Sequence, residues 1–274
     1  MSYDEFIVLC VGLVVATLGW IGWYAQAVRV TGLGGGRLAR GPVLLMPVAC
    51  VILLLVVLKQ LADPEVRSDV FYKALFAAAG ALSLLAIGLL AAVLGEGAID
   101  DAVERRNSAA AWATCGAWLA DTLVNCGANL GTGPTIYTTL GPMLMALAAL
   151  AGLWVGFSTV TANHISIGVD RDRASGVRLA GLLMAWGLIF GRAIAGDWVS
   201  VQGTLDDFVA QGWPALALLI VAAMVEFLVR PGRSRPAPRM LRAGVAPAAL
   251  YLAMAAAWLA WLGRWEGLAG PGRP

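Results

Sequence analysis

The sequence predicts an all-α, polytopic bundle of about eight transmembrane helices, and three observations lead to this fold class. Of the 274 residues, 60% are hydrophobic and only 13% are charged, whereas a soluble domain carries roughly 25% charged residues. The mean hydropathy is +0.79. Apolar runs of about twenty residues recur along the whole chain, and each is long enough to cross a hydrocarbon core of ~30 Å.

The expected spans follow one another with short, turn-forming loops between them. They lie at 6–28, 42–61, 70–95, 109–130, 138–160, 177–197, 209–229 and 244–263. Since no loop is long and polar enough to fold as a soluble domain, we expect residues 1–274 to form a single integral membrane domain. Within it, two N-terminal helices (1–69) and two C-terminal helices (199–274) flank a central core (70–198).

The distribution of Lys and Arg predicts the orientation of the chain. Most of these residues lie in the loops after the first, third, fifth and seventh spans. Short loops rich in Lys and Arg stay in the cytoplasm. We therefore expect both termini to lie outside, on the side where acidic residues such as Asp4, Asp63 and Asp206 gather.

An internal repeat of about 65 residues is expected in spans 3 to 6. The segments "RRNSAAAWATCGAWLADTLVNCGANLG" (105–131) and "DRDRASGVRLAGLLMAWGLIFGRAIAG" (170–196) align at a constant offset of 65. The offset pairs Gly116 with Gly181 and Gly131 with Gly196. Both segments begin at a loop predicted to be cytoplasmic and run outward, so the repeats are parallel and differ from the inverted repeats of many transporters.

These segments also carry a resemblance to a known family. The stretches "ERRNSAAAWATCGAWLADTLV" and "VDRDRASGVRLAGLLMAWGLIFGRAIAGDW" resemble the YjfL-type family of small bacterial inner-membrane proteins, which has no established activity. Its tandem two-helix units open their second helix with an Asn-x-Ala-Ala-like motif. The first copy keeps the motif at 107–110, and the second departs from it at 173–176. The resemblance covers about residues 70–198 and implies a bacterial inner-membrane location and a role related to membrane maintenance.

Span 4 carries polar residues on one face when each residue advances the helix by about 100°. They are Asn107, Thr114, Asp121, Asn125 and Asn129. A carboxylate at the bilayer centre costs ~3 kcal/mol on insertion scales, so Asp121 needs a partner, water or a proton. Two interpretations stay open: a polar path on which Asp121 binds a cation or carries a proton, or interhelical hydrogen bonding that holds the bundle together.

Arg192 is the expected ion-pair partner of Asp121. At the equivalent repeat position it lies ~9 Å further along the axis, at 1.5 Å per residue. The alternative is that Arg192 extends toward the outer interface. A second ion pair is expected within the seventh span, where Glu226 precedes Arg230 by four residues.

Small residues at a spacing of four predict two helix-packing faces. One runs along the fifth span and the other along the sixth, and they comprise Ala148, Gly152 and Gly156, and Gly187, Gly191 and Ala195. The four cysteines have no metal-ligand spacing, so we expect them to serve as small apolar residues. We expect no metal site, no cofactor and no catalytic residue, because no hydrolase, phosphate-binding or metal-ligand motif occurs.

Two classes of function follow. The first is a non-enzymatic scaffold or assembly subunit of the bacterial inner membrane. The second is a transporter or channel for a small solute, an ion or protons along the polar face around Asp121. The expected partners are the lipid bilayer, another copy of the chain or other membrane subunits, and an anionic lipid or a cytoplasmic protein at the loop 230–242. No nucleic-acid partner is expected.

Overall fold

The structure is a computed structural model that describes residues 2–31, 41–230 and 239–263, and every regular element in these ranges is a helix. The elements are α1 (Tyr3–Thr31), α2 (Gly41–Gln60), α3 (Pro64–Ser68), α4 (Val70–Val93), α5 (Ser108–Ala128), α6 (Tyr137–Thr161), α7 (Asn163–Gly168), α8 (Arg173–Ala193), α9 (Val201–Gly212), α10 (Pro214–Val229) and α11 (Ala246–Leu262), with two π-helices, η1 (Ala98–Glu104) and η2 (Leu241–Val245). The predicted all-α bundle is confirmed.

Seven segments in the described ranges are long and apolar enough to cross a membrane. They are Tyr3–Val30, Gly41–Gln60, Val70–Val93, Tyr137–Thr161, Arg173–Ala193, Val201–Val229 and Leu241–Leu262. The chain is therefore a multi-pass membrane protein. One of the eight predicted spans, the fourth (109–130), corresponds to α5 and is not among the seven, because its polar residues lower its hydropathy. Its length nevertheless equals that of α8, at 21 residues.

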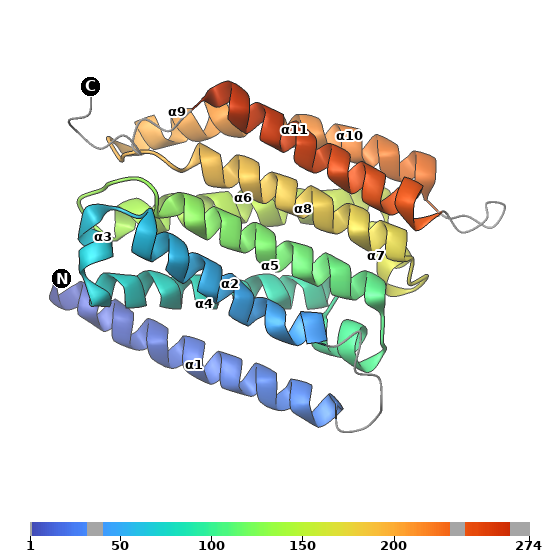
Figure 1. Ribbon diagram of the computed structural model, residues 1–274, viewed down its shortest axis with the longest axis horizontal. Helices are drawn as coiled ribbons and strands as arrows, with labels where there is room; N and C mark the ends of the chain where they lie inside the picture. Colours follow the sequence, from blue (N-terminus) through green and yellow to red (C-terminus); the bar gives the residue numbers. More distant parts are fainter. Residues whose placement is uncertain (1, 32–40, 231–238, 264–274) are drawn as a thin grey trace.

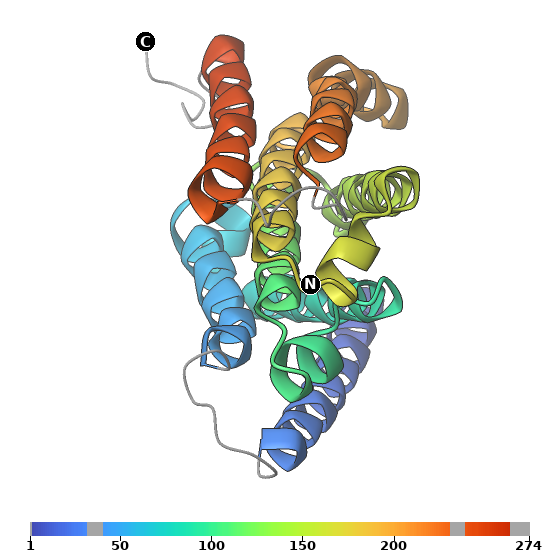
Figure 2. The same ribbon diagram turned by 90° about the vertical axis from the view of Figure 1, so that its right-hand side faces the viewer.

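The long helices lie side by side, and α5 and α8 form the centre of the bundle. Figure 1 places the start of α1, α3 and α9 at one end of the bundle and α7 at the other. Seen along the helices, α2 and α11 flank the central pair on one side, and α4, α6 and α10 lie on the other, with α1 outermost (Figure 2). We call the end with α3 the acidic end, since Asp4, Asp63 and Asp206 lie there, and the opposite end the basic end.

Glycines bring the backbones of α5 and α8 into direct contact. A Cβ atom on Gly187 would lie 2.7 Å from the Cα of Ala120, and one on Gly127 would overlap the carbonyl of Gly191. The predicted packing face at Gly187 and Gly191 is thus confirmed. Such close approach maximises dispersion contacts between helices that gain no hydrophobic free energy from associating in lipid.

The packing face predicted on the fifth span is wrong. A Cβ atom added to Gly152 or Gly156 would meet nothing within 4 Å. Ala148 is likewise exposed, so this side of α6 lies on the outside of the bundle. Small residues at a spacing of four permit a close contact, but a neighbouring helix must also face them.

Helices α5 and α8 keep the offset of 65 residues at their N-terminal boundaries. Asn107 caps α5 and Asp172 caps α8, each through its side-chain oxygens. The preceding residues, Arg106 and Arg171, both have a φ of 55°, a left-handed conformation that is uncommon for residues other than glycine. The two chain entries into the central helices therefore have the same local conformation.

The contact between α5 and α8 recurs between α8 and α11. Gly116 of α5 lies against Ala180 of α8, and Gly181, 65 residues after Gly116, lies against Ala248 of α11. In the same way Gly176 of α8 lies against Ala109 of α5, and Gly244 of η2 lies against Ala174 of α8. The three helices thus form a row in which each packs on the next through small residues.

Substituting Gly127 by Val should destabilise the fold, because the new side chain would overlap the main chain of α8, which cannot move aside. Overpacking typically costs about 1–3 kcal/mol, and a clash with main chain falls at or above the upper end. Gly152→Val is the matched control, since it makes the same change in side chain and helix propensity but meets open space. Thermal unfolding of the detergent-solubilised protein measures both. Equal unfolding midpoints for the two variants would contradict the backbone contact.

Candidate functional site

The middle of α5 carries a buried polar cluster formed by Asp121, Asn125 and Ser83 of α4, which we call the Asp121 cluster. Asp121 is 0% exposed. Its Oδ2 accepts hydrogen bonds from Ser83 Oγ at 2.9 Å and from Asn125 Nδ2 at 3.3 Å. Ser83 Oγ also lies 2.9 Å from the carbonyl of Gly80, so its single proton can satisfy only one of the two acceptors at a time.

Three buried oxygens on this face of α5 accept no hydrogen bond. They are Oδ1 of Asp121, Oδ1 of Asn125 and Oδ1 of Asn129, and we call them the oxygen ladder. They follow one another at one helical turn, since the three residues are four apart. The amide nitrogens of Asn125 and Asn129 donate to the carbonyls four residues earlier, at 2.9 and 2.8 Å, which fixes the orientation of both amides. Each unpaired buried acceptor costs about 1–3 kcal/mol. The ladder is a row of acceptors to which no group of the described residues donates.

The oxygen ladder ends at a small cavity at the acidic end. This acidic cavity of about 50 Å³ is lined by Glu5, Asp63, Glu65, Tyr72 and Asn129, among others. The Tyr72 hydroxyl donates to Glu5 Oε2 at 3.1 Å. A volume of this size holds a few water molecules. Asn129 is 4% exposed and contributes both to the cavity and to the oxygen ladder.

A second cavity lies on the other side of the Asp121 cluster, toward the basic end. This tryptophan cavity of about 370 Å³ is bounded by α1, α4, η1 and Trp118 of α5. The Trp118 indole nitrogen donates to the carbonyl of Leu84, the residue after Ser83, at 3.0 Å. Asp121 lines neither cavity. The carboxylate is therefore enclosed between two openings that stop short of it.

Asn107 and Thr114 are buried but do not belong to the Asp121 cluster. Asn107 Oδ1 accepts from the main-chain nitrogens of Ala109 and Ala110 at 3.0 and 3.3 Å, and its Nδ2 donates to the carbonyl of Ile167 at 2.7 Å. Thr114 Oγ1 donates to the main-chain carbonyl of Glu96. Both residues fix loops at the basic end, so the single predicted polar face consists of two separate groups.

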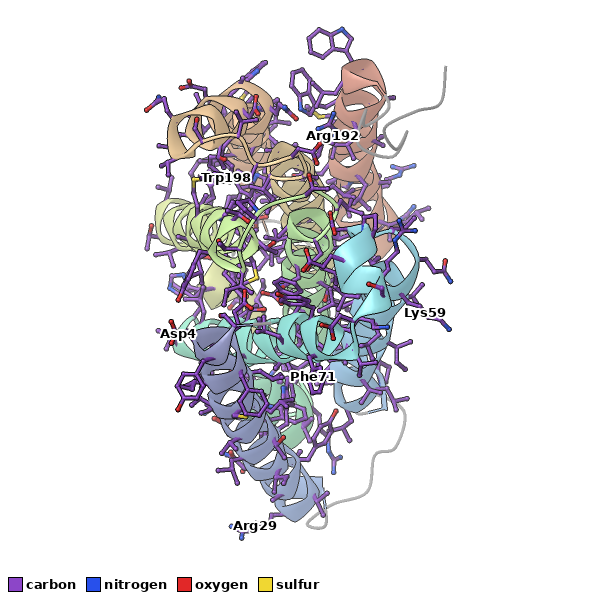
Figure 3. The ribbon with its side chains drawn as sticks, turned by 90° about the vertical axis from the view of Figure 1, so that its left-hand side faces the viewer. Asp4, Arg29, Lys59, Phe71, Arg192 and Trp198 are labelled. Atoms are coloured by element: carbon purple, nitrogen blue, oxygen red, sulfur yellow. The ribbon has the colours of Figure 1, made fainter. Side chains whose placement is uncertain are left out.

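The predicted ion pair between Asp121 and Arg192 is not formed. Arg192 Nη1 donates to Gln211 Oε1 of α9 at 2.7 Å. Figure 3 places Arg192 beside α11, well away from Phe71 at the start of α4. The two ion pairs among the described residues are Arg105–Asp101 and Arg178–Glu226. The distance along the axis allowed the pair, but Arg192 faces α9 whereas Asp121 faces α4.

A buried ion pair that the sequence did not predict joins α8 to α10. Arg178 and Glu226 are 2% and 1% exposed, and two hydrogen bonds of 2.9 and 2.8 Å connect them. The guanidinium also donates to Ser175 Oγ at 2.8 Å and to the carbonyl of Ala243. The expected pairing of Glu226 with Arg230 is wrong, because Arg230 donates to the carbonyl of Thr161. The sequence feature that could have predicted the Arg178–Glu226 pair is Glu226 itself, because a carboxylate within an apolar span needs a cationic partner.

Glu96 is another buried acid, and among the described residues its carboxylate has no side-chain partner. It lies in the loop between α4 and η1, is 0% exposed, and neither carboxylate oxygen has a hydrogen-bond partner. Burial raises the pKa of Glu96 well above its ordinary value, and the nearby Asp101 carboxylate raises it further. The Asp101 carboxylate itself accepts from Arg105 Nη1 and from the main-chain nitrogen of Gly97, both at 2.8 Å.

Comparison of the chain with protein-family models, with curated proteins and with solved structures finds no match. The resemblance to the YjfL-type family therefore stays a prediction. In the described ranges no group of three or more His, Cys, Asp or Glu side chains is placed to hold a metal ion, and the four cysteines are free thiols. The buried acids and their surroundings are the features that bear on function.

Removing Arg178 should destabilise the protein by about 3–5 kcal/mol, because Glu226 would keep a buried charge without a counter-ion. Arg178→Leu combined with Glu226→Leu should restore most of this loss, since neither charge then remains. Arg105→Ala removes a pair whose arginine is 63% exposed and should cost about 0–1 kcal/mol. Chemical unfolding in detergent measures all three. A double variant as unstable as Arg178→Leu would contradict the assignment.

The raised pKa of Glu96 predicts a pH dependence of stability. The folded state holds the proton more tightly than the unfolded chain, so stability is greatest below the ordinary value of 4.5 and falls as the pH rises toward the folded-state pKa. Glu96→Gln should flatten this fall, because the amide carries no titrating proton. Unfolding midpoints measured across a pH series test it, and parallel curves for the two proteins would exclude the effect.

Proposed function

We propose that this protein is a non-enzymatic transporter of small cations, protons included, in which Asp121 is the cation-exchanging group. The observation that carries the proposal is the oxygen ladder, a row of three buried acceptors that lacks a donor. A proton on Asp121 Oδ1 would neutralise the carboxylate and turn this oxygen into a donor. A small cation that bridges the carboxylate and the neighbouring amide oxygen would also neutralise the carboxylate, and hard cations prefer oxygen ligands.

The surroundings of the ladder support movement of the cation in both directions. Glu5, Asp63 and Glu65 give the acidic cavity three carboxylates, which attract cations to the mouth of the ladder. From there Asn129 and Asn125 lead to Asp121, one turn at a time. On the other side Trp118 and Leu84 separate Asp121 from the tryptophan cavity. A site that is enclosed between two partial openings is the arrangement that alternating access requires.

The scaffold interpretation accounts for the same residues less well. If Asp121 served only to hold helices together, its carboxylate should have a full set of partners, as Glu226 does with Arg178 and Ser175. Instead, within the described part of the chain, Asp121 has no cationic partner and its Oδ1 accepts no hydrogen bond. Leaving a carboxylate in this state costs stability, and intramembrane acids that persist at such a cost belong to ion and proton pathways.

We also propose that the basic end of the bundle faces the cytoplasm of a bacterial inner membrane, with both termini outside. The positive-inside rule supports this orientation. Arg29 lies at the end of α1, and Arg105, Arg171 and Arg230 lie at the same end of the bundle. With this orientation the acidic cavity opens to the exterior and the tryptophan cavity lies on the cytoplasmic side.

We further propose that α4–α5 and α6–α8 are two copies of a parallel repeat, and that α10–α11 is a third. The matching caps of α5 and α8 support the first pair. The recurrence of the Gly116–Ala180 contact as Gly181–Ala248 supports the third unit. The oxygen ladder occurs in one unit alone, because Trp186, Phe190 and Ile194 replace its residues in the next.

The test is cation flux in proteoliposomes that contain the purified protein. Wild-type protein should dissipate an imposed proton or monovalent-cation gradient faster than protein-free liposomes do, as followed by an enclosed pH- or cation-sensitive dye. Asp121→Asn should abolish this flux, since the amide cannot exchange a cation, while the helix keeps its shape. Ser83→Ala should reduce the flux, because it removes a hydrogen bond to Asp121 Oδ2.

Asp206→Asn is the matched control, since it makes the same chemical change at an exposed position of α9. It should transport as the wild type does. Wild-type liposomes that leak no faster than empty ones would contradict the proposal. So would an Asp121→Asn protein that is monodisperse, unfolds at the wild-type temperature and retains full flux.

A further inference from the structure

The tryptophan cavity has a composition that suits one class of ligand. Its lining combines the indoles of Trp20, Trp23 and Trp118 with Gln26 and Asp100. Asp100 is the charged residue among the lining residues, and it is exposed at one edge. At about 370 Å³ the cavity falls in the usual range for small-molecule sites, roughly 300–1,000 Å³. None of the three tryptophans belongs to the oxygen ladder.

The main chain holds two of the indoles in place. Trp20 Nε1 donates to the carbonyl of Ala81, and Trp118 Nε1 donates to that of Leu84, both at 3.0 Å. Because these polar hydrogens already have acceptors, the rings of Trp20 and Trp118 offer a ligand their π-electron surfaces and not their N–H groups. Polar ligands that need an indole donor are thereby disfavoured.

The rings meet at steep angles. Trp23 lies with its centroid 5.4 Å from Trp20 at 67°, and 5.8 Å from Trp118 at 75°. Two neighbouring glycines keep the space clear: a Cβ atom on Gly88 would lie 3.3 Å from Trp118 Nε1, and one on Gly19 would lie 2.6 Å from a methyl group of Leu85. Rings that are turned toward each other around an open volume resemble the aromatic cages that bind quaternary ammonium groups.

The charge at the cavity edge is negative. Asp101 already accepts from Arg105 and from the main chain of Gly97, so its carboxylate is occupied. The neighbouring Asp100 forms none of these contacts and lines the cavity. A carboxylate next to the electron-rich faces of indoles favours a cation, and the apolar walls formed by Leu84, Leu85 and Leu89 favour a ligand with an alkyl or aryl part.

We propose that the tryptophan cavity binds an amphiphilic organic ammonium ion, with its charged head between the indoles and Asp100 and its apolar part along α1 and α4. The ligand reaches the cavity from the bilayer, because α1 is the least buried of the candidate spans and forms the outer wall. The ammonium group can come from a lipid headgroup or from a free amphiphilic cation. The cavity binds either whether or not Asp121 carries a cation.

The test is equilibrium binding of an alkyltrimethylammonium ion to the full-length protein in lipid nanodiscs, with empty nanodiscs subtracted. Its uncharged isostere, in which carbon replaces the nitrogen, is the matched probe. Binding of the ammonium ion should saturate at one per chain, and the isostere should bind roughly tenfold more weakly, since it loses the cation–π and carboxylate attraction. Equal binding of the two probes, or no saturable binding, would overturn the proposal.

Variants locate the site. Trp23→Leu and Asp100→Asn should each weaken binding several-fold, whereas Trp23→Phe should retain most of it. Trp213→Leu is the control, because Trp213 contacts Trp258 at the acidic end, away from the cavity. Unfolding temperatures show which variants are folded. If Trp23→Leu does not fold, the binding measured for Trp23→Phe and Asp100→Asn decides whether the site is correctly located. A loss for Trp213→Leu as large as for Asp100→Asn would overturn the assignment.

Nanodiscs of two compositions separate the sources of the ligand. If phosphatidylethanolamine in the disc competes with the probe while phosphatidylglycerol does not, the natural occupant is a lipid headgroup. If neither lipid competes and the probe still binds at one per chain, the occupant is a free amphiphilic cation. Both results support an ammonium site.

Discussion

The backbone contact between α5 and α8 is the constraint on which the rest of the bundle depends. A membrane offers helices no hydrophobic gain from packing together, so their association must come from close contact and hydrogen bonding. Glycines on both helices allow that contact, because a side chain at Gly127 or Gly187 would overlap the opposing main chain. The contact places α5 at the centre, where other helices surround it. A helix with a carboxylate and two asparagines can span the bundle only in that position.

Two buried acids in the same bundle, Glu226 and Asp121, differ in the partners that surround their carboxylates. Glu226 meets Arg178, which provides two charge-assisted hydrogen bonds, and Ser175 and Ala243 complete the network. Such a pair offsets much of its own desolvation and fixes α8 to α10. Asp121 has neutral hydrogen-bond partners, and its Oδ1 accepts no hydrogen bond from the described residues. Among the described residues no cationic side chain pairs with it, which is the difference on which the proposed cation exchange rests.

The apolar runs predicted the helices well, and the helical period predicted that the polar residues of span 4 share a face. Both follow from local chemistry: the length of an apolar run and an angle of about 100° per residue. The partners could not be predicted in this way. Arg192 was expected near Asp121 and faces α9, while Arg178, for which no pairing was predicted, is buried against Glu226. The glycines of α6 matched those of α8 in spacing but lack a facing helix. Sequence spacing fixes which face a residue is on, and only the assembled bundle fixes what that face meets.

The tryptophan cavity and the buried carboxylate meet at consecutive residues of α4. Ser83 donates to Asp121, and the carbonyl of Leu84 accepts from Trp118, which forms one wall of the tryptophan cavity. A displacement of the Trp118 ring that breaks its hydrogen bond leaves the Leu84 carbonyl without that partner. The tryptophan cavity and the Asp121 cluster are therefore built on the same turn of α4, and each has its own hydrogen bond there.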